Sequence, residues 1–430
     1  MSHPIRIVIV GGGIAGILLA TRLGNHYAHS DEARVTLIDS SQTHIWKPML
    51  HTIAAGTRDV SQQQVSYLAH ASAHRFAWQP GRMCGLDRAR KEVLLDEIRT
   101  PEGELVLEPR TIPFDVLVLS VGSQANDFGV PGVRQHCHFI DSQKQAEAFN
   151  VVLRNRMLRA VAKDERLRVA IVGAGATGVE LSAELSRVLE IAEGYGDPTL
   201  RSRLSLTLLE SGPRVLASFP PKISASSEEQ LRHIGFRVQT STRVTAAQSN
   251  GFQIDGGRLV SADLMVWAAG VKAPDFMNNL AGMETTRSNQ IVVKATLQST
   301  SDDNIFALGD CASLTLMDHE RPLPPTAQVA TQQAEHLARH LPAWLARAPL
   351  PDFKFRDYGS LVSLSDYGAF GTLGSFGFFR GGFIRGRFAQ MSHAMLYRRL
   401  QQALHGFGKA ALMWSAEQIN SLVQPKIRLS

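Results

Sequence analysis

Two stretches of the chain share one order of apolar and polar positions: an apolar run, a glycine-rich turn, then apolar residues at helical spacing. The first, RIVIVGGGIAGILLATRL, covers residues 6–23, and the second, RVAIVGAGATGVELSAEL, covers residues 168–185. Each apolar run predicts a buried parallel strand, and the spacing after it predicts a helix. A second apolar strand follows both helices and ends in an acid, Asp39 or Glu210. The repeat predicts an α/β fold with two Rossmann-like dinucleotide-binding domains.

The glycines of both copies have the spacing G-x-G-x-x-G. The first glycine permits a tight turn, the second lets the backbone approach a pyrophosphate, and the third lets helix and strand pack closely. Amide groups at the helix start then hold the negative charge, and the acid accepts hydrogen bonds from a ribose. The candidate binding residues are Gly11, Gly13, Ile14, Ala15, Gly16 and Asp39 in the first copy, and Gly173, Gly175, Thr177, Gly178 and Glu210 in the second.

The second copy is longer than the first between its glycines and its acid. The interval from Gly178 to Glu210 exceeds the usual spacing of about 20 residues. The extra length includes EGYGDP, a turn-rich insertion. We therefore expect a longer helix and a longer loop after it.

Later segments indicate which dinucleotide each copy binds. IFALGDCA, residues 305–312, resembles the second FAD motif of the two-dinucleotide flavoprotein reductases, in which this aspartate binds the ribityl chain. LVLSVGS and LMVWAAG, residues 117–123 and 264–270, resemble the segments that close over each nucleotide. The resemblance implies FAD in the first copy and a nicotinamide nucleotide in the second. It adds Gly122, Ser123, Gly309 and Asp310 to the FAD residues and Gly270 to the NADH residues.

The acid of the second copy bears on the choice of nicotinamide nucleotide. A carboxylate at Glu210 accepts a hydrogen bond from a 2′-hydroxyl and repels a 2′-phosphate, which favours NADH over NADPH. Arg214 lies nearby in the sequence and weakens that preference.

The order of these motifs predicts three regions. A discontinuous FAD-binding domain covers residues 1–160 and 290–335, and an NADH-binding domain is inserted at residues 161–289. The remainder, residues 336–430, carries no fingerprint and is rich in Gly and Phe. We expect this last region to associate with a membrane, for reasons given below.

The composition is that of an ordinary globular protein, with 44% hydrophobic and 20% charged residues in a chain of 430. The three cysteines, Cys84, Cys137 and Cys311, form no CxxC or CxxxxC pair. This spacing excludes a disulfide reductase and indicates a reducing compartment. Cys137 and Cys311 are interpreted as structural. The histidines show no metal-ligand spacing and are interpreted as solvated or core residues, so no metal is expected.

Several further stretches match one family in order. HIWKPMLHTIAAG, TGVELSAEL, LMVWAAGVKAPDF, IFALGDCAS, PPTAQVATQQ and DYGSLVSLSDYGAFG together resemble the type II NADH dehydrogenases, from about residue 5 to about residue 425. The A-Q-x-A-x-Q segment that begins at Ala327 is the most discriminating, because related flavoproteins with other electron acceptors lack it. One departure is Thr52, where many relatives carry a glutamate.

The resemblance implies a single-subunit, FAD-dependent NADH:quinone oxidoreductase of the respiratory chain that pumps no protons. NADH would pass hydride to flavin N5, and two electrons would then reach a membrane quinone, ubiquinone or menaquinone. In this family Glu180 lies by the nicotinamide and isoalloxazine rings; alternatively, it is an acid favoured by the helix dipole. Gln328 and Gln332 would border the quinone pocket, unless they are satisfied core amides. The family also implies FAD contacts from Lys47, Met83, Ala327 and Gln328.

Two other functions remain open at this point. A sulfide:quinone reductase-like flavoprotein has the same fold and acceptor but takes electrons through cysteines at the flavin. A flavin- and NADH-binding signalling protein would turn over slowly and act mainly by binding partners. Turnover with quinone and the effect of replacing Cys137 and Cys311 distinguish these alternatives.

The C-terminal region has the composition of an interfacial anchor. Between Tyr367 and Ala416 there are six basic residues, eight Phe or Trp residues and no acid. Apolar residues at near-helical spacing from 388 to 407 predict a helix that enters the acyl boundary of an anionic lipid surface. Packing on the core or in a homodimer is the alternative. Nucleic acid does not fit the interleaved phenylalanines.

The location follows from the same features. The apolar run 7–20 is broken by glycines and lacks a basic leader and a cleavage pattern, so no signal peptide is expected. No apolar stretch reaches the length of a membrane-spanning helix. We therefore expect a peripheral protein on the cytoplasmic face of the inner membrane.

Overall fold

The computed structural model describes residues 3–57, 64–163, 165–194, 200–317, 319–373, 382–385 and 387–423. The chain forms two compact units. Unit 1 consists of Met1–Trp46, Gln63–Gln124 and Val271–Phe355. Unit 2 consists of Lys47–Gln62, Ala125–Gly270 and Arg356–Ser430.

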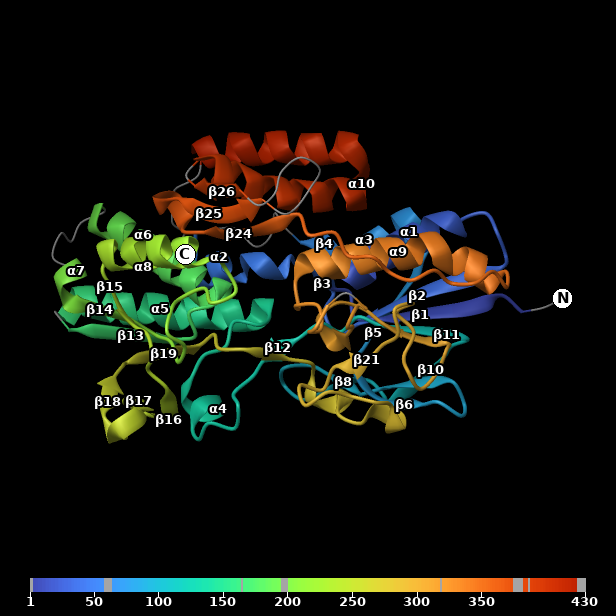
Figure 1. The fold of residues 1–430 in the computed structure, drawn as a ribbon, viewed down its shortest axis with the longest axis horizontal. Helices are drawn as coiled ribbons and strands as arrows, with labels where there is room; N and C mark the ends of the chain where they lie inside the picture. The colour runs from blue at the N-terminus through green and yellow to red at the C-terminus, as the bar shows by residue number, and fades with distance from the viewer. Residues whose placement is uncertain are drawn as a thin grey trace. The chain divides into compact units, whose positions relative to one another are not determined.

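The core of unit 1 is a five-stranded parallel sheet with β1 at its centre. The strands in spatial order are β22 (Ile305–Ala307), β11 (Val116–Leu119), β1 (Ile5–Val10), β2 (Ala33–Asp39) and β5 (Ala77–Pro80). Residues 7–10 of β1 are buried, as expected for a strand covered on both faces. Helices α1 (Ile14–His26) and α9 (Ala327–Leu345) lie side by side over this sheet, and α3 (Tyr67–His74) packs against α1 (Figure 1).

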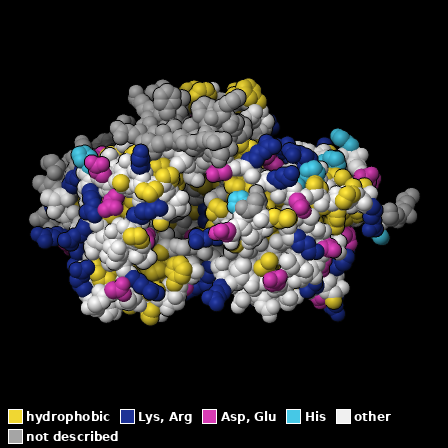
Figure 2. All heavy atoms as spheres, viewed as in Figure 1, with side chains coloured by type: hydrophobic (Ala, Val, Ile, Leu, Met, Phe, Trp, Pro, Cys, Tyr) yellow, Lys and Arg dark blue, Asp and Glu magenta, His cyan; other side chains and the backbone are white. Residues whose placement is uncertain are grey.

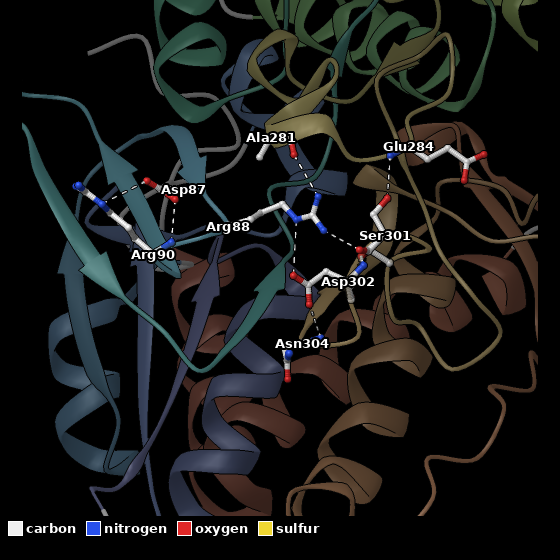
Figure 3. A network of polar contacts seen from close by, with 9 residues as sticks. Asp87, Arg88, Arg90, Ala281, Glu284, Ser301, Asp302 and Asn304 are labelled. Atoms are coloured by element: carbon white, nitrogen blue, oxygen red, sulfur yellow. Dashed lines mark hydrogen bonds and ion pairs between the residues drawn. The ribbon is translucent and has the colours of Figure 1, made fainter.

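A smaller antiparallel sheet in unit 1 has the order β10 (Arg110–Pro113), β7 (Glu92–Leu95), β6 (Met83–Asp87). Arg88, in the turn after β6, donates to Ala281 O at 3.4 Å and to Ser301 O at 2.7 Å (Figure 3). Its Nε lies 3.6 Å from Asp302 Oδ2. These contacts attach the sheet to the last segment of unit 1, so chain segments far apart in sequence complete one body.

The remaining elements of unit 1 are short. They are β3 (Thr43–His44), β4 (Val65–Ser66), β8 (Ile98–Arg99), β9 (Leu105–Leu107), β21 (Ile291–Val292), β23 (Ala312–Ser313), η3 (Asp275–Met277), η4 (Leu280–Gly282) and η5 (Gly309–Cys311). Strands β12 (Gln124–Ala125) and β20 (Val271–Lys272) lie where the chain passes between units.

Unit 2 repeats the parallel arrangement. Its four strands in spatial order are β15 (Phe236–Gln239), β14 (Leu204–Leu209), β13 (Leu167–Val172) and β19 (Leu264–Trp267). The helix after β13, α6 (Ala176–Gly194), has 19 residues against 13 in α1, which confirms the predicted extension. The rest of the insertion, residues 195–199, lies outside the described residues. The other helices around this sheet are α4 (Val133–His136), α5 (Gln143–Lys163), α7 (Leu200–Arg203) and α8 (Pro221–His233).

Several segments outside the second fingerprint also belong to unit 2. Helix α2 (Leu50–Ala55), preceded by η1 (Lys47–Met49), packs against α5 and α6. Residues 125–160, which include α4 and most of α5, also belong to unit 2. The sequence predicts them in the FAD-binding domain, because they precede the second fingerprint. An antiparallel sheet of β16 (Val244–Gln248), β17 (Gly251–Ile254) and β18 (Leu259–Ser261), with η2 (Asp255–Gly257), buries Phe252 against Trp267 of β19.

The C-terminal part of unit 2 is an antiparallel sheet covered by a helix. The sheet comprises β24 (Gly359–Ser363), β25 (Ala369–Leu373) and β26 (Gly382–Arg385), with η6 (Ser365–Tyr367) between the first two. Helix α10 (Arg387–Val423) packs on all three strands. Gly406 interrupts it with φ 77° and ψ 167°, a conformation that glycine adopts without strain. Figure 1 shows the two arms of α10 stacked on each other.

The side chains of α10 refine the predicted anchor. Leu400 and Leu404, in the first arm, are buried, whereas Phe407 and Leu412 are 77% and 72% exposed. Part of the apolar stripe therefore faces the protein, and the side chains at 388–396 lie outside the described set. Hydrophobic side chains are visible at the surface over α10 (Figure 2). In the described ranges, no helix combines the length and apolar character needed to cross a membrane.

Candidate active site

The first fingerprint forms the open cradle that its glycines predict. A Cβ on Gly16 would lie 1.8 Å from Gly11 O, so only glycine lets α1 pack on β1 at this point. At Gly13 the nearest described atom to such a Cβ is 3.9 Å away. Gly13 also precedes α1 without a side-chain cap, which leaves the helix's first amides to a ligand. This geometry fits a pyrophosphate.

Asp39, at the end of β2, is fixed by backbone amides. Its Oδ2 accepts from Gly12 N at 2.6 Å, and its Oδ1 accepts from Ser41 N at 2.7 Å. Burial nevertheless raises the pKa of the Asp39 carboxyl, and the two amides partly counteract that effect. Tyr67 donates its hydroxyl to Gly12 O at 2.7 Å, so the turn is held from both sides. The predicted acid and the predicted glycines therefore meet in one place.

The second FAD motif assembles next to a residue that the sequence analysis missed. Ser123 Oγ donates to Asp310 Oδ2 at 2.6 Å, which joins two of the predicted FAD residues. Gly122 and Gly309 have φ values of 72° and 68°, as glycine allows. The amide of Gly309 donates to Oε1 of Gln333 at 2.7 Å, and Gln333 is fully enclosed. The sequence carries no local signal for this bond, because it joins η5 to α9 across 24 residues.

The other residues assigned by resemblance are spread over both units. Ala327, Gln328 and Gln332 lie at the start of α9 and are half-buried. Met83 is buried in β6 of unit 1. Lys47 belongs to η1 of unit 2.

The second fingerprint repeats the cradle in unit 2. A Cβ on Gly178 would lie 1.9 Å from Gly173 O, and no described atom lies within 4 Å of such a Cβ on Gly175. Thr177 is exposed at the same edge. Glu210 Oε2 accepts from Ala174 N at 2.8 Å and its Oε1 accepts from Gly212 N at 2.7 Å. Both fingerprints thus fit a dinucleotide by the same contacts.

Arg214 does not point its charge at this acid. Its two terminal nitrogens donate to Phe219 O and Ala217 O, each at 2.6 Å. The guanidinium is therefore occupied by the loop it belongs to. This arrangement removes the reason for expecting Arg214 to weaken a preference for NADH.

Gly270 meets an aromatic side chain that the sequence did not single out. Gly270 has φ 64°, and a Cβ there would lie 2.4 Å from Phe128 Cζ. Phe128 itself is exposed and has the left-handed φ of 51°, which is rare for an aromatic residue. The ring therefore lies directly over the glycine that was assigned to NADH.

Glu180 lies in the second turn of its helix. Helix α6 begins at Ala176, so Glu180 is its fifth residue, and the interpretation of Glu180 as an acid favoured by the helix dipole loses its first-turn position. Helix α6 starts between the second and third glycines, which moves Glu180 away from the uncapped amides. The carboxyl is buried, and its Oε1 accepts from the Ser363 amide of β24 at 3.1 Å. Its Oε2 lies 3.5 Å from Nδ1 of His51 on α2.

A second acid follows on the same face of α6. Glu184 is also buried, and its Oε2 accepts from the Thr57 hydroxyl at 2.6 Å. Burial, with a smaller contribution from Glu184, raises the pKa of Glu180 to about 8, while the Ser363 amide opposes the shift. Glu180 is therefore largely a neutral acid at neutral pH, a state suited to donating a proton.

Thr52 takes no part in this acid pair. Its hydroxyl donates to Met49 O at 2.8 Å, within the local turn of α2. The Thr52 side chain therefore does not replace the carboxylate that many relatives carry at this position.

The cysteines are poorly placed for thiol chemistry. Cys311 is buried in unit 1, donates to Leu308 O and Leu119 O, and has a pKa raised to about 11 by burial. Burial raises the pKa of Cys137, in unit 2, to about 12. Because the thiolate is the reactive form, both act as small core residues. Within the described residues, no three or more His, Cys, Asp or Glu side chains gather as a metal site would require.

Comparison with known proteins extends the motif reading to the whole chain. A family model described as pyridine nucleotide-disulphide oxidoreductase matches residues 5–334. The type II NADH:quinone oxidoreductase of Haemophilus influenzae is 41% identical over 98% of this chain and 99% of its own length. The chain belongs to the type II NADH:quinone oxidoreductase family. The resemblance seen in the motifs is confirmed.

A more distant relative and two solved structures are also similar to this chain. The type II NADH:quinone oxidoreductase of Staphylococcus saprophyticus is 29% identical over 86% of this chain and 89% of its own length. The structure of NDH2 from Plasmodium falciparum in complex with NADH has a TM-score of 0.83 and 18% identity, and covers 99% of this chain and 100% of that one. The sulfide:quinone oxidoreductase of Aquifex aeolicus has a TM-score of 0.73, 16% identity and coverage of 99% and 96%. These two structures share the fold.

Proposed function

We propose that this chain oxidises NADH and reduces a quinone with FAD as its cofactor, without pumping protons. The observation that carries the proposal is the pair of glycine cradles, each closed by a carboxylate fixed on fingerprint amides. Two cradles require two dinucleotides, and the family combines FAD with NADH. Bound FAD supplies the two-electron chemistry between the two substrates.

Unit 1 carries most of the residues that would hold FAD. Asp39 would accept from the adenosine ribose, the α1 amides would hold the pyrophosphate, and Asp310, oriented by Ser123, would accept from the ribityl chain. These residues lie within the proposed FAD-binding domain, residues 1–160 and 290–335, although residues 125–160 pack in unit 2. The full set is Gly11, Gly13, Ile14, Ala15, Gly16, Asp39, Lys47, Met83, Gly122, Ser123, Gly309, Asp310, Ala327 and Gln328.

The second cradle would hold NADH within residues 161–289. Glu210 would accept from the 2′-hydroxyl of the adenosine ribose, and Gly175 leaves room for the pyrophosphate. Glu180 would act next to the nicotinamide ring as a buried, neutral acid. The full set is Gly173, Gly175, Thr177, Gly178, Glu180, Glu210 and Gly270.

Gln328 and Gln332 would bind the quinone head group. They lie one turn apart on α9, and amide N–H groups donate to quinone carbonyls without carrying a charge into an apolar tunnel. The half-buried position of both side chains supports this role. The quinone is ubiquinone or menaquinone.

Residues 336–430 would hold the protein on an anionic lipid surface at the cytoplasmic face of the inner membrane. A long-chain quinone stays in the bilayer, so the protein must lie on it. The second arm of α10 exposes Phe407, Leu412, Trp414 and Ile419, beside the exposed Lys409. Apolar side chains with a basic neighbour suit the acyl boundary of anionic lipid. A homodimer through the same face is the second candidate.

A vesicle test separates these two candidates. Phe407→Ser with Leu412→Ser should reduce binding to anionic vesicles and turnover with long-chain quinone, while turnover with a soluble quinone persists. Sedimentation at several concentrations reports a dimer. If binding is unchanged but the dimer is lost, this face is a protein contact.

The reaction itself is tested by anaerobic titration. NADH should bleach the yellow protein and a soluble quinone should restore the colour, at roughly 1 to 10³ turnovers per second. Slower turnover would favour the signalling alternative. Gln332→Ala should slow quinone use and leave flavin reduction fast, whereas the exposed Arg339→Ala control on the same helix should change neither. Replacement of Cys137 and Cys311 by serine should preserve NADH:quinone turnover, and its loss would favour the sulfide:quinone reductase alternative.

A further inference from the structure

A histidine and two carboxyls are buried together where α2 packs on α6. His51 Nδ1 lies 3.5 Å from Glu180 Oε2, and the two side chains are 6% and 9% exposed. Thr57, just after α2, donates to Glu184, one turn beyond Glu180. A buried carboxyl is costly unless specific partners hold it. Nothing in the packing of a parallel sheet requires such a group, so its persistence calls for a chemical reason.

The overall reaction has a proton requirement that matches this site. NADH gives up a hydride, which is two electrons and one proton, whereas a quinol holds two electrons and two protons more than the quinone. One proton must therefore come from solution in each turnover. A buried group that donates this proton must also recover it.

We propose that His51 is a positioning residue for this proton: it holds the Glu180 carboxyl and returns to it the proton that Glu180 gives up. In that step an N–H bond of the imidazolium breaks and the Glu180 Oε2–H bond forms. The imidazole then takes a proton from water, and the proton lost by Glu180 ends in an O–H bond of the quinol. The inference rests on the proposed function, since it assigns Glu180 to the NADH:quinone reaction.

Several titratable and polar groups surround Glu180 in addition to His51. From α6 itself come Glu184, held by Thr57, and Arg187, two turns along, which donates to Ser365 Oγ at 3.5 Å. Strand β24 contributes the Ser363 amide, which stabilises the carboxylate but carries no exchangeable charge. Other titratable groups on adjoining elements are Tyr367 of η6, which packs against α6, and Lys47 of η1, which packs against α2.

The ionisation of Glu180 agrees with this role. Its pKa of about 8, raised mainly by burial, keeps it protonated at neutral pH yet able to ionise during turnover. An imidazole side chain can both accept and donate a proton near neutral pH. The rate of quinone reduction should therefore fall as pH rises through about 8. A rate that stays flat through that range in the unaltered protein would overturn the proposal.

The decisive variants are His51→Asn and His51→Ala, compared with His70→Asn. Asparagine places an N–H near the position of Nδ1, but its amide does not take up or release a proton near neutral pH. His70 is a buried histidine of unit 1 that is hydrogen-bonded to Thr21. Both His51 variants should slow quinone reduction about 10- to 100-fold, with flavin reduction by NADH within about twofold of wild type. His70→Asn should match wild type. Normal quinone reduction in His51→Asn would overturn the proposal.

Two further measurements distinguish this inference from the proposed function. The infrared C=O band of the protonated Glu180 carboxyl is identified by its loss in Glu180→Gln. In the wild type the intensity of this band should fall with a midpoint near pH 8. In His51→Ala its midpoint should rise by about one pH unit, because a donor beside the carboxylate is gone. The double variant His51→Asn/Glu180→Gln should be no slower than Glu180→Gln alone. Additive effects or an unmoved midpoint would refute the coupling, whereas a protein that NADH never reduces would refute the proposed function instead.

Discussion

Leu18 in α1 and Glu180 in α6 occupy the same place, two residues beyond the third glycine of their fingerprints. In both fingerprints the third glycine lies against the carbonyl oxygen of the first. A Cβ added to the third glycine would lie 1.8 Å from that oxygen in the first copy and 1.9 Å in the second. Both acids, Asp39 and Glu210, accept from two backbone amides. Yet Leu18 is a fully buried apolar residue, whereas Glu180 is a buried carboxyl.

The difference lies in what packs on the two helices. Helix α1 packs against α9 and α3, and Leu18 is fully buried. Helix α6 packs against α2 and β24, which bring His51 and the Ser363 amide to Glu180. The same local sequence pattern therefore gives a buried leucine in unit 1 and a buried carboxyl with polar partners in unit 2. Segments outside the fingerprint decide which one forms.

Exchanging the two residues tests this account most severely. Leu18→Glu would place a carboxylate at a fully buried position, so unit 1 should lose about 4 to 5 kcal/mol of unfolding free energy. We expect lost FAD and a sharply lower denaturation midpoint. Leu18→Met, which keeps volume and polarity, should cost less than about 1.5 kcal/mol. A Leu18→Glu protein as stable as the methionine control would show that the two positions are equivalent.

Replacement of the third and second glycines separates folding from binding within one cradle. Gly178→Ala would drive a Cβ into Gly173 O and should cost about 3 kcal/mol or more. Gly175→Ala meets no described atom within 4 Å, so the fold should persist while NADH affinity falls. Thermal denaturation and NADH titration measure the two effects. Equal losses of stability would mean that the Gly175 edge is not the open side of the cradle.

The ionisation of Glu180 predicts a pH dependence of stability that Leu18 has no means to produce. Its folded pKa of about 8 exceeds the ordinary glutamate pKa of 4.5, so the folded state binds more protons than the unfolded state between these pH values. Wild-type stability therefore falls as pH rises through this window. Glu180→Gln lacks the ionisation, and its advantage over wild type should grow by about 2 kcal/mol from about pH 5 to pH 7. Chemical denaturation at both pH values checks this; parallel curves would contradict the burial of an ionisable Glu180.

Much of the fold was predictable because it depends on local patterns. The strand, glycines, helix and acid of each copy appear in the structure as β1, α1 and β2, and as β13, α6 and β14. Glycine spacing and apolar runs act within about 40 residues, a range over which sequence order implies proximity. A helix over residues 388–407 was also expected from its periodicity, and this range falls within α10.

The rest depended on contacts between distant residues. The His51–Glu180 pair joins α2 to α6, and the Gly309–Gln333 bond joins η5 to α9; neither leaves a local pattern. The short strands of the sheet β24–β26 contain Gly and Ser, and they do not alternate clearly between apolar and polar residues. The register of α6, which moves Glu180 out of the first turn, also depends on packing rather than on composition.

Asp39 and Glu210, the acids at the ends of the two fingerprints, can be compared through the effect of Glu210 on the choice between NADH and NADPH. Glu210→Ala removes an acceptor for the 2′-hydroxyl and the charge that repels a 2′-phosphate, so relative use of NADPH should rise about tenfold, or about 1.4 kcal/mol. Arg214→Ala should leave that ratio unchanged, because its guanidinium already donates to Phe219 O and Ala217 O. Initial rates with both nucleotides measure the ratio. FAD content should stay constant, because Asp39 and not Glu210 is the acid proposed to contact FAD. If Arg214→Ala lowers NADPH use, the guanidinium leaves its loop to meet the phosphate, and the acid alone does not set the preference.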